Sequence, residues 1–392
     1  MNIGFMDPRK KPTLIATTTA IMAAHYGVKI IYFNPQNIDQ KNHLVRGKQY
    51  INNKWIPVTK KLPTLIDAAS KSYKKDTREI MNYLRKNTVL TFDKEGTPSK
   101  EELQKLLYED PEFSNIVIPT KRLDSFESLE KFIMKYNHII LKPNNGKQGK
   151  GIYSLKKEGD SYILSYDKKE RIINNIDLNT FLNNYLIESN YLMQKMIISR
   201  TKEGHPFDCR VIVQKNHTGK WTIGKIFFRI GTGQKIVSNT SQGGSISDAK
   251  PFLIDNYESQ WNDIYQKLKK LSVTLPNKFE KIKGTPTMDL GLDIGIDETG
   301  DLYLFEVNNG AAVKRLASIS AKLRLEYYQY LIKNHPELKK IKKNINNNSK
   351  KLKLKKIRKE RDLYKKKYNN IIRSKSWRLT KPFRKINTYL KK

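Results

Sequence analysis

The sequence has almost no cysteine and no long apolar run. Among its 392 residues there is one cysteine, Cys209, which excludes an intrachain disulfide framework and a zinc site built from clustered cysteines. The six histidines are scattered without metal-ligand spacing, so they are interpreted as surface or local hydrogen-bonding residues. No stretch approaches the roughly 20 apolar residues of a membrane span, and the N-terminus lacks the basic start and apolar core of a signal peptide. These absences predict a cytoplasmic protein.

Acidic residues are also scarce, and most scarce at the C-terminus. The chain carries 75 lysines and arginines against 38 aspartates and glutamates, a net charge of +37. Residues 336–392 alone hold 23 basic and 3 acidic residues, a net charge of +20, which leaves +17 for residues 1–335. The body is therefore moderately basic and ordinary in composition, whereas the tail is an extremely basic appendage with apolar residues at helical steps.

The N-terminal pattern alternates between strand and helix. Residues 2–6 and 28–33 have the composition of strands, and residues 13–26 between them carry small and apolar residues at helical spacing. This order predicts a βαβ unit. A hairpin turning at Asn52-Asn53 and a helix near 76–86 follow, and we place a small α/β domain at residues 1–97.

The middle of the chain is expected to hold two further α+β subdomains, at residues 98–190 and 191–335, before the tail at 336–392. Ser99 and Glu102 form a capping-box pattern at the start of a helix. The other expected elements are strands at 115–120, 138–143, 152–157, 191–197, 210–214 and 221–230, helices at 125–136, around 178–186 and between about 248 and 275, and a final hairpin of residues 290–297 and 301–308 that turns at 298–300.

The final hairpin carries the strongest group of candidate site residues. Glu306 and Asn308 alternate onto one face of their strand, and Asp293 on the partner strand comes opposite them. Two carboxylates and an amide oxygen suit Mg²⁺, which usually keeps waters and substrate phosphates as its other ligands. The alternative interpretation is a solvated acidic hairpin.

A second candidate element is the segment ILKPNNGKQGKGIY. A strand delivers Lys142, and glycines in the following loop leave backbone N–H groups able to fold over phosphates, with two lysines adding charge. The spacing is not that of a P-loop, and the alternative is a lysine-rich hairpin tip. The loop residues in question are Gly146, Lys147, Gly149, Lys150 and Gly151.

Two arginines form a third candidate group. Asp208 and Arg210 lie on the same face of one strand, Arg229 ends the next strand, and the glycine-containing loop 237–245 follows. Two arginines beside a flexible loop suit an anionic substrate or developing phosphoryl charge, although each arginine alone is also typical of a surface ion pair.

In their order and spacing these motifs resemble the ATP-grasp superfamily. The shared pattern is Lys-Pro, a glycine loop, Asp-x-Arg, Ser-Asn…Gly-Gly and Asp…Glu-x-Asn, and the N-terminal GFMDP, FNPQNID and WIP segments are more narrowly similar to the YheC/YheD type of endospore coat-associated proteins. The resemblance covers residues 1–330. It implies an ATP-grasp fold of two α+β subdomains, preceded by a small Rossmann-like pre-ATP-grasp domain and followed here by a basic helical tail.

The resemblance also implies roles for individual residues. Lys100 and Lys142 would contact the nucleotide's phosphates, Gly146 to Gly151 would form a flexible phosphate lid, and Arg210, Arg229 and Lys142 would act on the γ-phosphate and the activated carboxylate. Gln194 takes the hinge position, although relatives often carry glutamate there, and the loop after Asn308 departs from the Lys-Pro or Ser-Pro of many relatives. The remaining implied roles are an adenine contact through the backbone of Met196, apolar faces for the base from Ile152 and Phe305, and two Mg²⁺ ions, with Mn²⁺ as the alternative, held by Asp293, Glu306 and Asn308.

Activity implied by this resemblance is ATP-dependent joining of a carboxylate to an amine or thiol through an acylphosphate. The partners would be a small-molecule or glycan carboxylate and an amine acceptor. A non-catalytic nucleotide-binding coat or scaffold protein and a polyanion binder remain alternatives, although the body holds no nucleic-acid module and nucleic acid is not an expected partner.

The tail carries a further resemblance. Its end, RSKSWRLTKPFRK, is similar to the Ser-x-Ser-Trp-Arg-x-Thr-x-Pro-x-Arg signature near the ends of many bacterial cell-surface glycan glycosyltransferases. A cationic helix with Trp377 and Phe383 suits an anionic lipid surface, so residues 336–392 are expected at the inner face of the cell membrane and the substrate in the cell-envelope polysaccharide. The alternative is a solvated tail.

Overall fold

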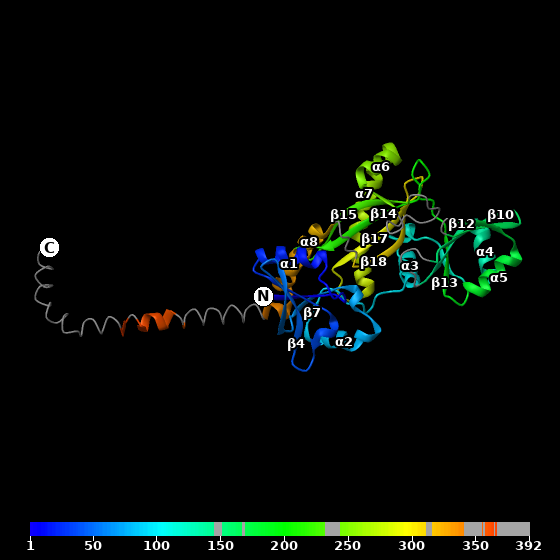
Figure 1. Cartoon of the computed structure of the whole chain (residues 1–392). Coiled ribbons are helices and arrows are strands. Elements are labelled where there is room, and N and C mark those ends of the chain that lie inside the picture. The colour runs from blue at the N-terminus through cyan, green and yellow to red at the C-terminus, as the bar shows by residue number, and fades with distance from the viewer. Residues whose placement is uncertain are drawn as a thin grey trace, which may run out of the picture. The chain divides into compact units, whose positions relative to one another are not determined.

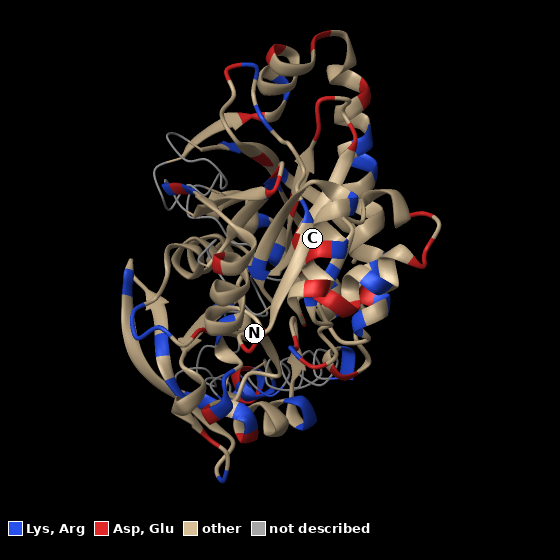
Figure 2. Ribbon diagram, turned by 90° about the vertical axis from the view of Figure 1, so that its right-hand side faces the viewer, with Lys and Arg blue, Asp and Glu red and all other residues tan. Residues whose placement is uncertain are grey.

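The computed structural model describes residues 1–144, 151–166, 169–231, 244–310 and 316–340, and of the remaining tail residues 355, 357–363 and 365–366, which are helical. The chain divides into two compact units, Met1–Tyr330 and Leu331–Lys392. Within the described residues no helix is long and apolar enough to cross a membrane. Basic and acidic residues are interspersed along the ribbon of the first unit, so its excess of positive charge is not confined to one element (Figure 2).

The predicted βαβ unit is confirmed at the N-terminus. Strand β1 (Asn2–Met6) pairs in parallel with β2 (Lys29–Phe33), and α1 (Leu14–His25) connects them with Thr13 as its N-cap. The hairpin is confirmed as well, because Asn52 and Asn53 between its strands both have positive φ, as a two-residue hairpin turn requires. The seven-stranded sheet has the order β3-β4-β2-β1-β6-β7 with β5 paired to β4, and its other elements are β3 (Ile38–Asp39), β4 (Leu44–Ile51), β5 (Lys54–Lys61), β6 (Leu65–Ala68), β7 (Val89–Leu90), η1 (Pro35–Asn37), η2 (Ser70–Ser72), η3 (Lys75–Thr77) and α2 (Arg78–Asn87).

A six-stranded antiparallel sheet follows, in the order β12-β11-β10-β9-β13-β8. Helices α4 and α5 share one hydrophobic core with this sheet, and Figure 1 shows both helices beside β10, β12 and β13. The elements are β8 (Thr120–Arg122), α4 (Phe126–Tyr136), β9 (His138–Pro143), β10 (Tyr153–Glu158), β11 (Ser161–Tyr166), β12 (Lys169–Ile173), α5 (Asn175–Tyr185) and β13 (Tyr191–Lys195).

The strand predicted at 115–120 is wrong. Residues Ser114–Ile116 form the 3-10 helix η4, and the strand begins only at Thr120. Ile116 and Ile118 are both buried, and Ile116 packs in the core of a different sheet, the five-stranded one. The apolar alternation therefore reflects burial of an irregular connecting segment. Such a segment can show the same period-two alternation as a strand.

The five-stranded sheet has the order β16-β15-β14-β17-β18 and two unlike faces. One face, with Cys209, Val211 and Leu292, packs against α3, α6 and α7 in the largest hydrophobic core. The other face meets α8 at one end, where the Gln214 side chain donates to the carbonyl of Ser320. The elements are α3 (Lys100–Tyr108), β14 (Phe207–Lys215), β15 (Trp221–Ile230), β16 (Ser245–Asp248), α6 (Ala249–Tyr257), η6 (Glu258–Gln260), α7 (Trp261–Lys283), β17 (Asp289–Ile296), β18 (Leu302–Asn309) and α8 (Ala317–Asn334).

This mixed α+β architecture agrees with the predicted fold class. The predicted helices begin and end within a few residues of their expected bounds, except that α7 continues to Lys283 through Pro276. The domain boundaries at 97, 190 and 335 stay predictions. Elements that the sequence reasoning missed include β6, β7, β11, β12, β16 and α8.

Candidate functional site

The β17–β18 hairpin brings the predicted metal-ligating residues together. Asp293 is the direct cross-strand partner of Glu306, and Asn308 lies opposite Gly291, two residues further along the same face. The Asn308 side-chain nitrogen donates to Oδ2 of Asp293 over 3.1 Å. Carboxylates directly opposite one another repel, so this pairing needs cations nearby.

A β-bulge sets the position of Phe305. Asp293 pairs with Glu306 and Ile294 pairs with Leu304, so Phe305 is the extra residue on β18. Its ring lies over Gly295, where a Cβ atom would collide with the ring edge. Because Gly295 lies two residues from Asp293 on the same face of β17, the ring flanks the predicted metal ligands.

Two arginines surround Asp293. Arg210, its direct partner on β14, donates to both carboxylate oxygens, with the NH2 contact to Oδ2 at 2.8 Å. Arg229 forms a two-pronged ion pair with Asp208, its cross-strand partner, and its NH2 also lies 3.2 Å from Oδ2 of Asp293. All four side chains are largely buried, so the structure holds the predicted catalytic arginines in a fixed ion-pair network rather than on an open surface.

Glu306 meets a lysine from a different part of the chain. The Lys100 ammonium lies 3.1 Å from Oε1 of Glu306, and both side chains are about one-third exposed. Lys100 is the first residue of α3, where the predicted capping box of Ser99 and Glu102 is present. A cation at a helix N-terminus is unfavourable with the helix dipole. Its position here, on the carboxylate at the start of a helix, adds positive charge to the cluster.

Lys142 is held by the predicted hinge residue. Its ammonium donates to Oε1 of Gln194 over 2.8 Å, and the Gln194 nitrogen donates to the Thr120 hydroxyl over 2.8 Å. Burial and, to a smaller extent, the nearby Lys100 lower the pKa of Lys142 to about 8, against the opposing effect of Glu306. Lys142 of β9 therefore interacts electrostatically with Lys100 of α3 and with Glu306 of β18.

The charges of this cluster leave one positive charge in excess. Four cationic side chains accompany three carboxylates, which suits binding of a more highly charged anion such as a phosphate group. The cations are Lys100, Lys142, Arg210 and Arg229, and the carboxylates are Asp208, Asp293 and Glu306.

The donor set fits Mg²⁺ of the kind that bridges protein to phosphate. In the part of the chain that the structure describes, no group of three or more His, Cys, Asp or Glu side chains could hold a metal. Two carboxylates and one amide oxygen are hard ligands, and Mg²⁺ commonly takes one or two carboxylates and completes its shell with water and phosphate. Glu306 is the more open carboxylate, whereas both oxygens of Asp293 already accept hydrogen bonds from Arg210.

Other predicted residues lie at the margin of this cluster or outside the described residues. Ile152 follows Gly151, whose positive φ of 72° and close approach to Tyr191 and Pro143 require glycine. The N–H of Met196 donates to the carbonyl of His138 over 3.0 Å, so that donor is already used within the sheet. Gly146, Lys147, Gly149 and Lys150 lie outside the described residues, as do residues 232–243 of the second loop.

Sequence reasoning missed two supports of the cluster. Thr120 orients Gln194, and no motif marks it. The carbonyl of Asn309, directly after the predicted metal ligand Asn308, accepts from the Ser70 hydroxyl over 3.2 Å and so connects β18 to the N-terminal sheet. The NNG sequence could have signalled a tight turn there, but not its partner 239 residues away.

The fold and this cluster together define an ATP-grasp protein. Solved structures with the same fold include the ATP-grasp ligase PsnB complexed with minimal precursor, with a TM-score of 0.51 and 13% identity, covering 84% of this chain and 98% of that one. D-alanyl-alanine synthetase A from Vibrio cholerae O1 biovar eltor gives a TM-score of 0.50 at 11% identity, over 84% and 96% of the two chains. At these identities the likeness concerns the fold alone.

The family assignment comes from sequence. Residues 89–334, more than half of the chain, match the family described as YheC/D like ATP-grasp, and the chain belongs to that family. Endospore coat-associated protein YheC of Bacillus subtilis (strain 168) is 23% identical over 340 residues, which cover 84% of this chain and 93% of YheC. YheD of the same organism is also 23% identical, over 84% of this chain and 76% of YheD.

Proposed function

We propose that this chain is an ATP-dependent ligase that joins a carboxylate to an amine, with a thiol as the other acceptor class. The observation that supports this proposal is the convergence of four cations and three carboxylates around the middle of the β17–β18 hairpin, in a family whose fold is ATP-grasp. The reaction needs no protein nucleophile, which agrees with a cluster made of lysines, arginines and hard oxygen ligands.

The geometry supports the residue roles that the family resemblance implies. Lys100 and Lys142 bind the phosphates, and Arg210 and Arg229 neutralise charge as a carboxylate oxygen of the substrate attacks the γ-phosphorus and ADP leaves. The amine then attacks the acyl carbon of the acylphosphate, and inorganic phosphate leaves. Gly151 ends the glycine loop that would close over the phosphates, and Phe305 and Ile152 would offer apolar faces to adenine.

Metal ligands complete the proposal. Asp293, Glu306 and Asn308 would hold Mg²⁺, in two ions or with Mn²⁺ as a substitute, and the metal would neutralise and orient the phosphate oxygens. Metal binding by Asp293 would require a loosening of its ion pair with Arg210. Arg210 would then exchange partners, from Asp293 to the transferred phosphoryl group.

Alanine at Glu306 tests the assignment. The side chain is about one-third exposed and bonds to Lys100, so its removal is expected to abolish ATP turnover and leave the melting temperature nearly unchanged. Turnover is measured as ADP release across amino acids and uronic-acid glycans. Full activity in the Glu306→Ala protein would reject the site, and ATP binding without turnover on any substrate pair in the unmodified protein would favour the nucleotide-binding scaffold function.

For the tail we propose attachment to an anionic membrane surface, with the ligase acting in the cytoplasm on cell-envelope polysaccharide. The net charge of +20 in residues 336–392 supports this, since each Lys or Arg near such a surface contributes about 1 kcal/mol. The full chain should pellet with anionic liposomes and a chain ending at residue 335 should not. Equal pelleting of both would remove the membrane proposal, and the spore coat, after which YheC is named, would then become the better location.

A further inference from the structure

A cavity of about 610 Å³ opens in the N-terminal sheet, away from the ATP cluster. It lies where the loop after β1, the 3-10 helix η1 after β2 and the β4–β5 hairpin meet. Ligands of open parallel sheets typically bind at this carboxyl edge of the strands. The cavity is lined by Arg9, Lys10, Tyr32, Phe33, Asn34, Gln36, Asn37, Arg46, Gly47, Lys48, Pro57, Val58 and Thr59.

The lining is positively charged. It includes four cationic side chains and no carboxylate. Arg9 is paired with Asp7 through two contacts of 2.8 and 2.6 Å, so the excess charge rests on Lys10, Arg46 and Lys48. Lys10 and Arg46 are exposed and Lys48 is half-buried, so all three can reach a ligand. The charge favours an anionic ligand.

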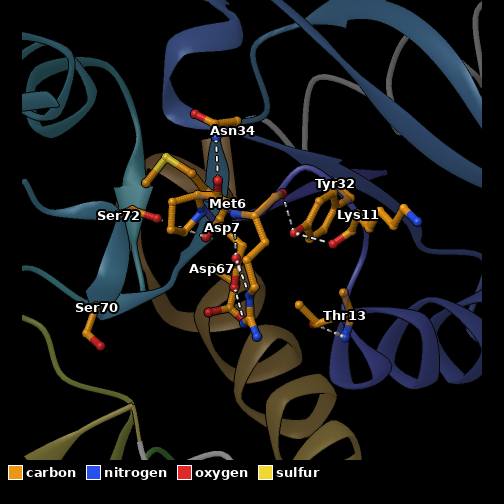
Figure 3. A network of polar contacts seen from close by, with 12 residues as sticks. Met6, Asp7, Lys11, Thr13, Tyr32, Asn34, Asp67, Ser70 and Ser72 are labelled. Carbon is orange, nitrogen blue, oxygen red and sulfur yellow. Dashed lines mark hydrogen bonds and ion pairs between the residues drawn. The ribbon is translucent and has the colours of Figure 1, made fainter. Parts of the chain in front are cut away.

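The side chains of Tyr32 and Asn34 hold the loop that carries Arg9 and Lys10. The Tyr32 hydroxyl donates to the carbonyls of Arg9 and Lys11 over 2.8 and 3.0 Å, and the Asn34 side chain donates to the carbonyl of Pro8 over 2.7 Å. Dashed lines in Figure 3 mark the hydrogen bonds of Tyr32 and Asn34 with this loop. These hydrogen bonds fix the backbone of residues 8–11. This part of the cavity wall is therefore preorganised for binding.

Position along the sheet relates the cavity to the ATP cluster. The cavity lies at the ends of β2 and β4, and Ser70, which contacts Asn309 of the metal hairpin, follows β6. Strands β2 and β6 flank β1, so Ser70 lies about two strand spacings, or about 10 Å, from the end of β2. A ligand that occupies the cavity and also extends past Ser70 towards the ATP cluster must be longer than this distance, which favours an oligomer over a single small unit.

The aromatic residues of the lining argue against a nucleic acid. Binding of single strands relies on exposed rings on which bases stack. Tyr32 and Phe33 are each 2% exposed, so neither offers a face. Asn37 and Thr59 are exposed polar groups that can donate to and accept from hydroxyl groups.

We propose that this cavity binds an acidic oligosaccharide, through Lys10, Arg46 and Lys48 on its carboxylate or phosphate groups and through Asn37 and Thr59 on its hydroxyls. The proposal that the chain binds such an oligosaccharide rests on the cavity alone. Only the further role, holding the polymeric substrate while one of its units enters the ATP cluster, rests on the proposed ligase function.

The test measures binding to the full-length chain by fluorescence anisotropy. The probes are a labelled tetramer of galacturonic acid, the same tetramer with its carboxyl groups methyl-esterified, and a tetramer of neutral sugar phosphorylated on each unit. Lys10→Gln combined with Arg46→Gln should weaken binding of a charged tetramer about tenfold, since exposed charge pairs contribute modestly but jointly. The charged tetramer that loses more affinity identifies the anionic group.

A matched control separates the cavity from general basic surface. Lys29→Gln combined with Lys54→Gln removes the same two charges at the opposite edge of the same sheet, where both lysines are exposed, and should change binding less than twofold. Equal weakening in both double variants, or equal binding of the esterified tetramer, would overturn the proposal. An oligothymidylate that binds more tightly than the charged tetramers and depends on Lys10 and Arg46 would overturn the glycan assignment.

Failure of this inference can be told from failure of the proposed function. Glu306→Ala should bind the tetramer as the unmodified protein does, because Glu306 lies in the ATP cluster. Tetramer binding by a protein that turns over no ATP would support the cavity proposal and reject the ligase proposal. ATP turnover without cavity-dependent tetramer binding would support the ligase proposal and reject the cavity proposal.

Discussion

Lys142 illustrates how a single residue can be charged or neutral according to what it binds. Its ammonium is removed from water and has Gln194, a neutral partner, at 2.8 Å. Burial and Lys100 together bring its pKa to about 8, against the pull of Glu306. A phosphate in the cluster would favour the charged form, so proton uptake and nucleotide binding are coupled.

Nucleotide affinity should therefore fall as pH rises. If only the protonated Lys142 binds phosphate, a pKa of about 8 predicts roughly tenfold weaker ATP binding at pH 9 than at pH 7. In Lys142→Arg the guanidinium stays charged, and the dissociation constant should be nearly flat over that range. Titration with a fluorescent ATP analogue measures both slopes, and parallel slopes would mean that another group titrates.

Gly295 gives a second prediction at this scale. A methyl group there would collide with the Phe305 ring, and overpacking of a close contact costs typically about 1–3 kcal/mol. If Phe305 meets adenine, Gly295→Ala should raise the dissociation constant for ATP by about tenfold. Gly224→Ala in the same sheet is the control, because its nearest neighbour, the Ile212 carbonyl oxygen, is 3.4 Å away. Unchanged ATP affinity in Gly295→Ala would remove Phe305 from the adenine site.

Single residues also mark the limit of prediction from sequence. Alternation correctly puts Asp208 and Arg210 on one face, and the β17–β18 hairpin puts Asp293 beside Glu306. The ion pair of Arg210 with Asp293 depends on the register of two strands that lie 83 residues apart, which no local pattern encodes. The bulge at Phe305 could not be predicted either, because one extra residue in a strand does not alter the composition of the strand.

Among the elements, α3 is the one whose start matters for the site. The Glu102 N–H donates to the Ser99 hydroxyl over 3.2 Å, and Oε2 of Glu102 accepts from the Ser99 N–H over 2.8 Å. This box fixes the first turn, which carries Lys100 to Glu306.

Loss of the cap should therefore affect stability and function together. Ser99→Ala is expected to lower the free energy of unfolding by about 0.5–2 kcal/mol and to weaken ATP binding, because the first turn frays. Ser99→Thr keeps a hydroxyl and should restore most of both. Urea unfolding and ATP titration provide the two measurements. A stable Ser99→Ala protein with unaltered ATP affinity would show that the box does not position Lys100.

Elements with strong local signals were the ones correctly predicted. Helices α1, α3 and α4 each begin after a Ser or Thr N-cap, of which Ser99 was predicted and is confirmed, and the Asn52-Asn53 turn is a local hairpin signal. The 115–120 segment failed because its apolar residues are fixed by tertiary packing in a second core. Strand β12 was missed because four of its five residues are exposed and show no apolar alternation.

At the scale of the molecule, a buried ion cluster joins three segments far apart in sequence. Arg324 of α8 bonds to Asp67 of β6 at 2.5 Å and to Asp289 of β17 at 2.6 Å, and Tyr328 and Thr91 donate to Asp67. All of these side chains are buried. The strand that carries Asp293, the proposed metal ligand, is thus attached to the N-terminal sheet four residues earlier, at Asp289.

Removal of the central cation should be severe. Arg324→Met leaves two carboxylates buried without a counter-charge and is expected to lower the free energy of unfolding by about 3–5 kcal/mol. Asp67→Asn and Asp289→Asn added to it should recover much of the loss. On the same helix Lys322 is exposed and 4.0 Å from Glu326, so Lys322→Met should change stability by less than about 0.5 kcal/mol. Urea unfolding of the four proteins checks this, and equal losses for both single variants would contradict it.

The same cluster limits how the protein can be divided. The family match begins at residue 89, after Asp67, so a fragment that begins there would lack β6 and would leave Arg324 with only one of its two acids, Asp289. The ligase-like region and the N-terminal sheet are therefore not interchangeable modules. A chimaera that swaps in another N-terminal domain would have to supply a buried carboxylate at the position of Asp67 before its ATP site could form.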